Sequence, residues 1–296
     1  MEKLLEVKDL KVSFFTDLGE TQAVKGAGFA IGEGDFFGIV GESGSGKSVT
    51  TKSILRLGPS NCKIMGGEIA MIFQDSLSAL NPVYTVGNKM VELIRRHTNM
   101  NKKEAKARVL ELLTAVGITD PEKAMNSYPH ELSGGMRQRV MIAMAMSSDP
   151  KILIADEPTT ALDVTIQAQI LHLLLELQKK NNMSIILITH DLGVVAQTCK
   201  RVAVMCGGYV VEEGTVEEIF LHPGHPYTQA LIASMPRVGG TFEQFLERDL
   251  SDGNGDLCPF LNRCKYADKT CEACLPKYYE ASEGHRIFCH RREEKR

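Results

Sequence analysis

FFGIVGESGSGKS, at residues 36–48, places an apolar run, a glycine-rich turn and the start of a polar segment in direct succession. The apolar run 36–40 predicts a short strand buried on both faces, and the pattern of residues 48–57 predicts a helix. The turn at residues 41–48 fits G-x-x-x-x-G-K-[ST], whose glycines let successive backbone N–H groups face phosphate oxygens. A chance glycine-rich turn is the alternative, and the flanking strand and helix argue against it.

The turn predicts a phosphate-binding site in which the lysine and the serine of the pattern have separate roles. Lys47 is expected to reach the β- and γ-phosphates of a nucleotide, and the Ser48 hydroxyl to ligate Mg²⁺. The N-terminus of the helix adds partial positive charge beside the phosphates. The residues predicted to bind nucleotide here are Gly41, Glu42, Ser43, Gly44, Ser45, Gly46, Lys47, Ser48 and Val49.

Short apolar runs alternate with helical patterns along the chain, which predicts an α/β fold with a mostly parallel central sheet. The block from about residue 84 to 128 has a helical pattern throughout and predicts a helical subdomain inserted into that sheet. The expected strands are 36–40, 69–73, 152–156, 185–189 and 202–206, and the expected helices are 48–57, 104–116, 137–147 and 166–179.

Two neighbouring acids follow a buried strand in KILIADEPT, residues 151–159. Ligands of open α/β sheets bind beyond the carboxyl ends of parallel strands, where Asp156 and Glu157 are expected to lie. Asp156 is predicted to hold Mg²⁺, and Glu157 to accept a proton from an attacking water. The alternative, a helix-capping acid pair, is disfavoured because Pro158 follows at once and the next threonines can cap.

Gln74 and His190 also end apolar runs. Gln74 carries an amide able to reach both the metal and the attacking water. His190 closes IILITH, and its strand-end position predicts contact with the γ-phosphate or the water, although a lone histidine is more often structural. Both residues are therefore candidates for the nucleotide site.

The segment LSGGMRQR, residues 132–139, completes an ordered series of motifs that resembles an ATP-binding cassette (ABC) ATPase. The other members are the phosphate loop, Gln74, the strand ILIADE, the segment ALD with Asp163, and His190. In this family two cassettes meet head to tail, and the LSGG segment of one covers the ATP of the other. The resemblance implies that Ser133, Gly134, Gly135 and Gln138 bind ATP in trans; Ser133 is at the same time a helix N-cap.

The resemblance also implies roles near the N-terminus and in the helical block. LKVSFF is similar to the strand that supplies an aromatic ring to adenine, which assigns this contact to Phe14, with a core position as the alternative. The helical block is expected to grip cytoplasmic loops of permease subunits. The segment between Lys47 and Gln74 is shorter than is usual in the family, so the antiparallel strands that normally fill it are expected to be truncated or missing.

The segments MIFQDSLSALNPVYTVG and FLHPGHPYTQALIASMPR are similar to ATPase subunits of oligopeptide, dipeptide and nickel importers. This resemblance implies an ATP-hydrolysing motor that imports peptides, with nickel as the second choice. The implied partners are a related but different cassette, two transmembrane permeases and an extracytoplasmic substrate-binding protein. The expected location is the cytoplasmic face of the cell membrane, because the N-terminus lacks a signal peptide and no apolar run is long enough to span a bilayer.

Two rival functions remain within the same family. One is an ABC ATPase acting on ribosomes or nucleic acid, which a net charge of −3 and the lack of a basic surface signature disfavour. The other is a regulatory cassette with an impaired site, which the presence of both Glu157 and His190 disfavours.

Five of the eight cysteines lie between residues 258 and 289. The expected organisation is a cassette over 1–236, a polar linker over 237–257 and a cysteine-rich extension over 258–296 that lacks the aliphatics for a core. In a reducing compartment such clusters indicate metal ligands rather than disulfides. Resemblance to related subunits implies a [4Fe–4S] cluster on Cys258, Cys264, Cys271 and Cys289, with Zn²⁺ as the alternative and Cys274 as a spare.

Overall fold

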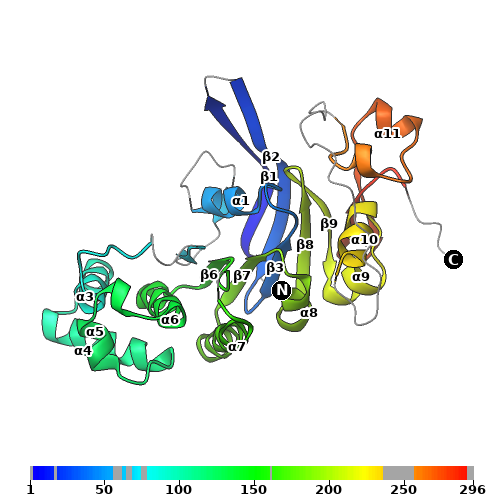
Figure 1. The fold of residues 1–296 in the computed structure, drawn as a ribbon. Helices are drawn as coiled ribbons and strands as arrows, with labels where there is room; N and C mark the ends of the chain where they lie inside the picture. The colour runs from blue at the N-terminus through cyan, green and yellow to red at the C-terminus, as the bar shows by residue number, and fades with distance from the viewer. Residues whose placement is uncertain are drawn as a thin grey trace. The chain divides into compact units, whose positions relative to one another are not determined.

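The computed structural model of the chain describes residues 3–16, 19–55, 62–64, 69–74, 79–160, 162–235 and 257–291. These residues form two compact units, the first built from residues 1–65 and 188–296 and the second from residues 66–187 (Figure 1). The linker predicted over residues 237–257 lies outside the described residues except for its last position. The predicted domain boundaries therefore stay a prediction.

The first unit contains an antiparallel sheet of three strands in the order β2-β1-β4 and a second group in the order β10-β11-β9-β8-β3. Strand β3 pairs in parallel with β8, whereas β9, β11 and β10 continue the group with antiparallel pairings. The strands are β1 (Lys3–Thr16), β2 (Gly19–Gly32), β3 (Phe36–Val40), β4 (Cys62–Ile64), β8 (Arg201–Cys206), β9 (Tyr209–Thr215), β10 (Tyr278–Ser282) and β11 (His285–Phe288).

Helices of the first unit begin at residues whose side chains satisfy the first backbone N–H groups. Asp191 caps α8, Thr215 and Glu218 form a capping box on α9, and Asp268 caps α11. The helices are α1 (Lys47–Ile54), α8 (Leu192–Thr198), α9 (Val216–Leu221), α10 (Pro226–Ala233) and α11 (Lys269–Ala273), with a 3₁₀ turn η4 (Leu261–Arg263).

The second unit has three strands in the order β7-β6-β5, of which β5 and β6 pair in parallel. Its helices start at capping residues as well, including Thr85, Asn101, Asp120, Ser133 and Asp163. The elements are β5 (Ile69–Ile72), α3 (Val86–His97), α4 (Lys102–Ala115), α5 (Pro121–Asn126), η1 (Pro129–Glu131), α6 (Gly134–Ala145), η2 (Met146–Ser148), β6 (Ile152–Asp156), α7 (Val164–Asn181) and β7 (Ser184–Thr189).

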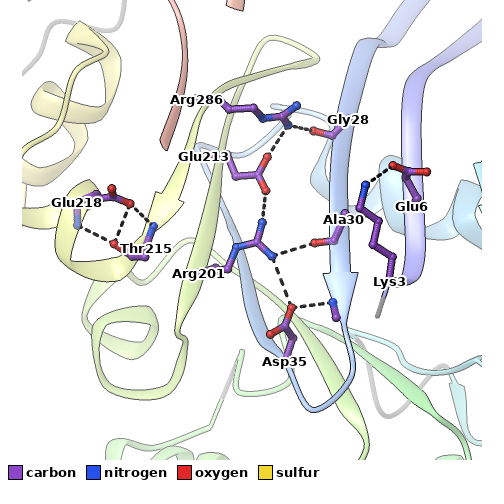
Figure 2. A network of polar contacts seen from close by, with 11 residues as sticks. Lys3, Glu6, Gly28, Ala30, Asp35, Arg201, Glu213, Thr215, Glu218 and Arg286 are labelled. Carbon is purple, nitrogen blue, oxygen red and sulfur yellow. Dashed lines mark hydrogen bonds and ion pairs between the residues drawn. The ribbon is translucent and has the colours of Figure 1, made fainter. Parts of the chain in front are cut away.

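The cysteine-rich extension contributes strands to the first unit, which the sequence alone did not predict. Strand β11 pairs with β9, and Arg286 of β11 donates to Glu213 of β9 (Figure 2). Arg201 donates to the other oxygen of Glu213 at 2.6 Å and lies 3.5 Å from Asp35. Glu213 is only 3% exposed, and the two arginines compensate its buried negative charge. Because Arg286 lies on β11, the same row of charges joins the extension to the sheet.

All five predicted strands are present, and the core is built from their residues: every residue of β3, β6 and β7 is buried. The predicted helix starts at 104, 137 and 166 were too late by two or three residues, because the polar first turns carry no apolar periodicity. The first helix ends at Ile54 rather than at residue 57. Strand β4 pairs with β1 inside the short segment, so the antiparallel sheet is not missing.

None of the helices in the described ranges is both long and apolar enough to cross a membrane.

Candidate functional site

The phosphate loop between β3 and α1 takes a backbone conformation that its glycines make possible. Gly41, Gly44 and Gly46 have φ values of 152°, 79° and 99°, in the region that side chains disfavour. A Cβ atom on Gly41 would lie 2.2 Å from the carbonyl oxygen of Met205, and one on Gly46 would lie 2.6 Å from that of Ala23. The loop is thus pressed against its neighbours at both ends and requires glycine there.

Lys47, at the start of α1, is 6% exposed and folds back over the loop. Its ammonium donates to the carbonyl oxygens of Gly41 and Glu42, each at 2.8 Å. Inside the loop the Ser45 hydroxyl is buried and has no hydrogen-bond partner among the described residues. Buried polar groups rarely go without a partner, so the loop contains the donors that an anionic ligand would use.

Gln74 and Glu157 lie opposite each other because of the register of two neighbouring strands. Ile72 of β5 pairs with Ala155 of β6, and the same register continued by two residues places Gln74 beside Glu157. The Gln74 amide donates to Glu157 Oε2 at 2.9 Å, and the Thr160 hydroxyl donates to the same oxygen at 2.9 Å. The structure therefore brings together two of the predicted site residues from separate motifs.

Glu157 has a left-handed backbone with φ of 47°, which is uncommon for a residue other than glycine. Such strained residues concentrate at functional sites, where the surrounding structure holds them. Asp156, the preceding residue, is 1% exposed at the end of the fully buried strand β6. One acid is thus enclosed at the strand end while the next is turned out by its backbone conformation.

Ser133 caps α6, and its hydroxyl accepts from the Met136 N–H at 3.3 Å. The first N–H groups of any helix lack partners within the helix, so Gly134 and Gly135 present donors at this terminus. A Cβ atom on Gly135 would lie 2.8 Å from the Ile166 side chain, which explains the need for a small residue. Asp163, predicted from the ALD segment, caps α7 by accepting from the Ile166 N–H at 3.0 Å.

The structure describes where His190, Phe14 and Gln138 lie, but their predicted contacts with the nucleotide stay predictions. His190 is exposed directly after β7. Phe14 and Phe15 on β1 are 50% and 81% exposed, so neither is a core residue. The Gln138 side chain is 4% exposed on α6, and its amide nitrogen has no hydrogen-bond partner in the described part of the chain. The adenine contact of Phe14 and the trans contact of Gln138 stay predictions.

The four cysteines assigned as cluster ligands line a single cavity, together with His225 and Phe260. Cys274 is not among the residues that line this cavity. Burial is the largest cause that raises the pKa of Cys258, to about 11, with a further contribution from the negative charge of the other three thiols. The four thiols, which are soft ligands by type, thus line one cavity, but no group of three His, Cys, Asp or Glu residues in the described ranges is arranged to hold a metal ion.

Four residues that contact the site residues or line the cysteine cavity were not predicted from the sequence. Thr160 was considered only as a helix cap, yet it binds Glu157. Tyr227 and Arg263 both contact Glu42 of the phosphate loop. His225 lies in the wall of the cysteine cavity. His225 and Tyr227 belong to the H-P-Y segment at residues 225–227, and Arg263 precedes Cys264, but no local pattern indicates partners so far away in the sequence.

A phosphate loop between a buried strand and a helix, an acid pair after β6 and a serine-capped glycine helix together define an ABC-type ATPase cassette. Solved structures agree with this class. The dimeric bacterial ABC transporter cassette MJ0796 aligns with a TM-score of 0.65 and 29% identity, covering 72% of this chain and 98% of that one. The cassette cbiO1 from Clostridium perfringens, part of the transporter complex cbiONQ, also gives a TM-score of 0.65, with 28% identity over 75% of this chain and 92% of that one.

Within that class, the chain belongs to the ATP-binding proteins of the oligopeptide and dipeptide ABC transporter family. Residues 24–160 match the ABC transporter family, and residues 211–271 match the C-terminal region of oligopeptide/dipeptide transporters. The oligopeptide transport ATP-binding protein OppD of Bacillus subtilis is 48% identical, covering 96% of this chain and 88% of its own length. The dipeptide transport protein DppD of the same organism is 47% identical, covering 98% and 95%.

Proposed function

We propose that this chain is the ATP-hydrolysing motor subunit of an importer for peptides. The observation that carries the proposal is the combination of an ATPase cassette with a separate match, over residues 211–271, to the C-terminal region of oligopeptide/dipeptide transporters. Relatives named for oligopeptide and dipeptide transport align with nearly the whole chain, which supports peptides over nickel as cargo.

In the proposed hydrolysis, the phosphate loop and the residues that follow strands β5, β6 and β7 have different roles. Lys47 and the loop N–H groups bind the phosphates, and Ser48, Gln74 and Asp156 supply the oxygen ligands that Mg²⁺ prefers. When bound, Mg²⁺ neutralises charge on the phosphate oxygens. Glu157, which accepts from Gln74 and Thr160, takes the proton of the attacking water, and His190 stabilises the charge that develops on the transferred phosphate.

A second cassette completes the site in this proposal. The glycine end of α6 is a helix N-terminus, which is a favourable place for an anion such as the γ-phosphate. Ser133, Gly134, Gly135 and Gln138 act on the nucleotide of the partner cassette, and Asp163 supports the same contact between cassettes. The relative MJ0796 was solved as a dimer, including a post-hydrolysis state with ADP and phosphate, which supports pairing of cassettes here. We propose a related, non-identical chain as the partner.

The permease contact is proposed for the second unit. An apolar groove there is lined by Phe73, next to Gln74, by Leu93 and His97 of α3, and by Met141 and Met144 of α6. Phe73 is 41% exposed although it is a large apolar residue. Because Phe73 is covalently next to Gln74, a permease loop seated in this groove would move the residue that holds Glu157. Two permeases and an extracytoplasmic binding protein then complete the transporter, with this chain at the cytoplasmic face.

The cysteine cavity is proposed to hold a [4Fe–4S] cluster on Cys258, Cys264, Cys271 and Cys289. Four thiols of different segments around one cavity supply the ligand set of such a cluster. Zn²⁺ on the same four thiols is the alternative occupant. A bound cluster supplies cross-links that a coreless extension otherwise lacks, as well as a redox-sensitive group.

The experiment that tests the importer is affinity purification of the tagged chain from detergent-solubilised native membranes, followed by mass spectrometry. Two polytopic permeases and a second cassette are expected, and a mock-tagged strain is the control. Ribosomal or nucleic-acid-processing partners without a permease would overturn the importer. The co-encoded or co-purifying binding protein is then titrated with di- and oligopeptides and with Ni²⁺; binding of Ni²⁺ alone would overturn the peptide assignment.

A further inference from the structure

Glu42, the second residue of the phosphate loop, is held by a residue of the cysteine-rich extension. Arg263 donates from Nη1 and Nη2 to the two carboxylate oxygens of Glu42, at 2.9 and 2.8 Å. Such a two-point pair fixes orientation as well as charge. The Arg263 side chain is 14% exposed, so this pair is more enclosed than a typical surface ion pair. The contact joins residues 221 positions apart in the sequence.

The backbone of the same residue is held by the H-P-Y segment. The Glu42 N–H donates to the Tyr227 hydroxyl at 2.9 Å, and the Tyr227 side chain is almost fully buried. The Tyr227 N–H in turn donates to His225 Nδ1 at 3.0 Å. Tyr227 and His225, two residues apart, thereby connect the phosphate loop to the wall of the cysteine cavity.

His225 lies in the wall of the cavity and has one ring nitrogen that forms no hydrogen bond with the described residues. Because Nδ1 accepts a hydrogen bond, the neutral ring carries its proton on Nε2. His225 is 1% exposed, and its Nε2 has no hydrogen-bond partner among the residues that the structure describes. A buried donor of this kind beside four cysteines is placed to bind a sulfur atom of whatever occupies the cavity.

A second line of contact reaches the other half of the loop. The Gly208 N–H donates to the Ser45 carbonyl oxygen at 3.1 Å. A Cβ atom on the neighbouring Gly207 would lie 2.6 Å from Pro259, the residue that follows Cys258. The loop is thus contacted through Glu42 directly and through the 207–208 turn indirectly, in both cases from the segment 258–264.

Arg263 has an electrostatic task as well as a geometric one. An unpaired carboxylate in a loop that binds a triphosphate would repel the ligand, and the guanidinium of Arg263 cancels that charge. Arg263 is also adjacent in sequence to Cys264, so its position depends on how the cysteines are arranged. The Glu42–Arg263 ion pair therefore connects the phosphate loop to the segment that carries Cys264.

We propose that Arg263 and Tyr227 are positioning residues for the phosphate loop, and that through them the occupancy of the cysteine cavity sets the affinity of this chain for ATP. The link to occupancy rests on the metal group proposed above, whereas the positioning role of Arg263 does not. The extension then acts on the nucleotide site of its own chain, in addition to stabilising itself.

The test is equilibrium binding of a fluorescent ATP analogue to the purified full chain with Mg²⁺. R263Q is expected to weaken affinity about three- to five-fold, as for loss of one partly exposed charge pair, with a smaller effect at high salt. The double variant E42Q/R263Q is expected to recover most of the loss, since it removes the repelling carboxylate. R286Q is the matched control, because Arg286 pairs with Glu213 in the same extension but does not touch the loop.

Wild-type affinity in R263Q or an equal loss in R286Q would each overturn the positioning role, and no recovery in E42Q/R263Q would overturn the electrostatic role of Arg263. Iron is measured in the same samples and removed with a chelator. Removal is expected to weaken ATP binding in the wild type and to have no further effect in R263Q; equal effects in both would overturn the link to the cavity. Protein that contains no metal as purified would remove that link and the cluster together, while the R263Q comparison would still decide the role of Arg263.

Discussion

Glu157 illustrates how one residue combines strain, contacts and position. Its left-handed backbone turns the side chain out of the end of β6, and both Gln74 and Thr160 donate to the same carboxylate oxygen. These two neutral donors help to set the orientation of the carboxylate, which we propose as the general base.

Glu157→Gln is expected to lower ATP turnover by about 100-fold or more, because an amide cannot accept the proton. ATP affinity should be retained, since the phosphate contacts are unchanged, and ATP should accumulate in a closed cassette dimer. Phosphate release measures turnover, and gel filtration with ATP measures pairing. Glu176→Gln, an exposed acid on α7, is the control. Unchanged hydrolysis in Glu157→Gln would remove Glu157 as the base.

The cysteines differ in reactivity according to burial. Burial raises the pKa of Cys199 to about 12, and it raises the pKa of Cys206 further, whereas Cys274 is exposed. The thiolate is the reactive form of cysteine, so the two buried thiols are expected to react slowly. With iodoacetamide and peptide mapping, Cys274 should be alkylated first and Cys199 only after unfolding. Alkylation of folded Cys199 at the rate of Cys274 would contradict the burial assignment.

Whether a site residue could be predicted depends on how close its partners lie in the sequence. The phosphate loop, Asp156 and Glu157 could be predicted because each motif contains its own strand end or helix start. The Glu42–Arg263 pair could not, because nothing in either segment specifies the other. The left-handed backbone of Glu157 was also beyond prediction, since acidic residues rarely adopt it and no glycine marks the position.

At the scale of elements, strand β9 joins the extension to the cassette through two adjacent acids on opposite faces. Glu212 is fully buried and accepts from the backbone N–H groups of Gly224 and His225 and from the His285 ring. Glu213 lies between Arg201 and Arg286 (Figure 2). A short extension without its own core is thereby docked by buried polar contacts as well as by strand pairing.

Glu213→Gln is expected to lower the free energy of unfolding by about 2 kcal/mol, because two arginines lose a buried counter-charge while remaining about a third exposed. Lys3→Gln is the control: the exposed Lys3–Glu6 pair in the same view should contribute nothing measurable (Figure 2). Urea unfolding followed by circular dichroism gives both values. Equal, small shifts would show that the row of charges does not dock the extension.

The elements themselves were largely predictable, and the errors have physical causes. Apolar runs predicted five strands that are all present, of which β3, β6 and β7 are buried along their whole length. Helix starts were placed late because capping residues such as Asn101 and Asp163 are polar and precede the periodic pattern. Strands β2, β4, β9, β10 and β11 were not predicted, because charged or polar residues interrupt the apolar residues in each of them.

At the scale of the whole molecule, a ligand that binds only the folded chain must stabilise it. MgATP at about 100 times its dissociation constant contributes about 2.7 kcal/mol, which for a chain of this size raises the melting temperature by about 4 °C. Lys47→Ala should lose this shift, since Lys47 is the cation proposed to meet the phosphates. The measurement is thermal unfolding with and without MgATP.

Lys52→Ala provides the matched control for that experiment, because Lys52 lies on the exposed side of the same helix α1. Its ATP-dependent shift should equal that of the wild type. An undiminished shift in Lys47→Ala would place the nucleotide elsewhere and overturn the phosphate loop as the binding site. Loss of the shift in both variants would indicate that changes to α1 act on folding of the loop rather than on contact with phosphate, so only the difference between the two lysines supports the proposed role of Lys47.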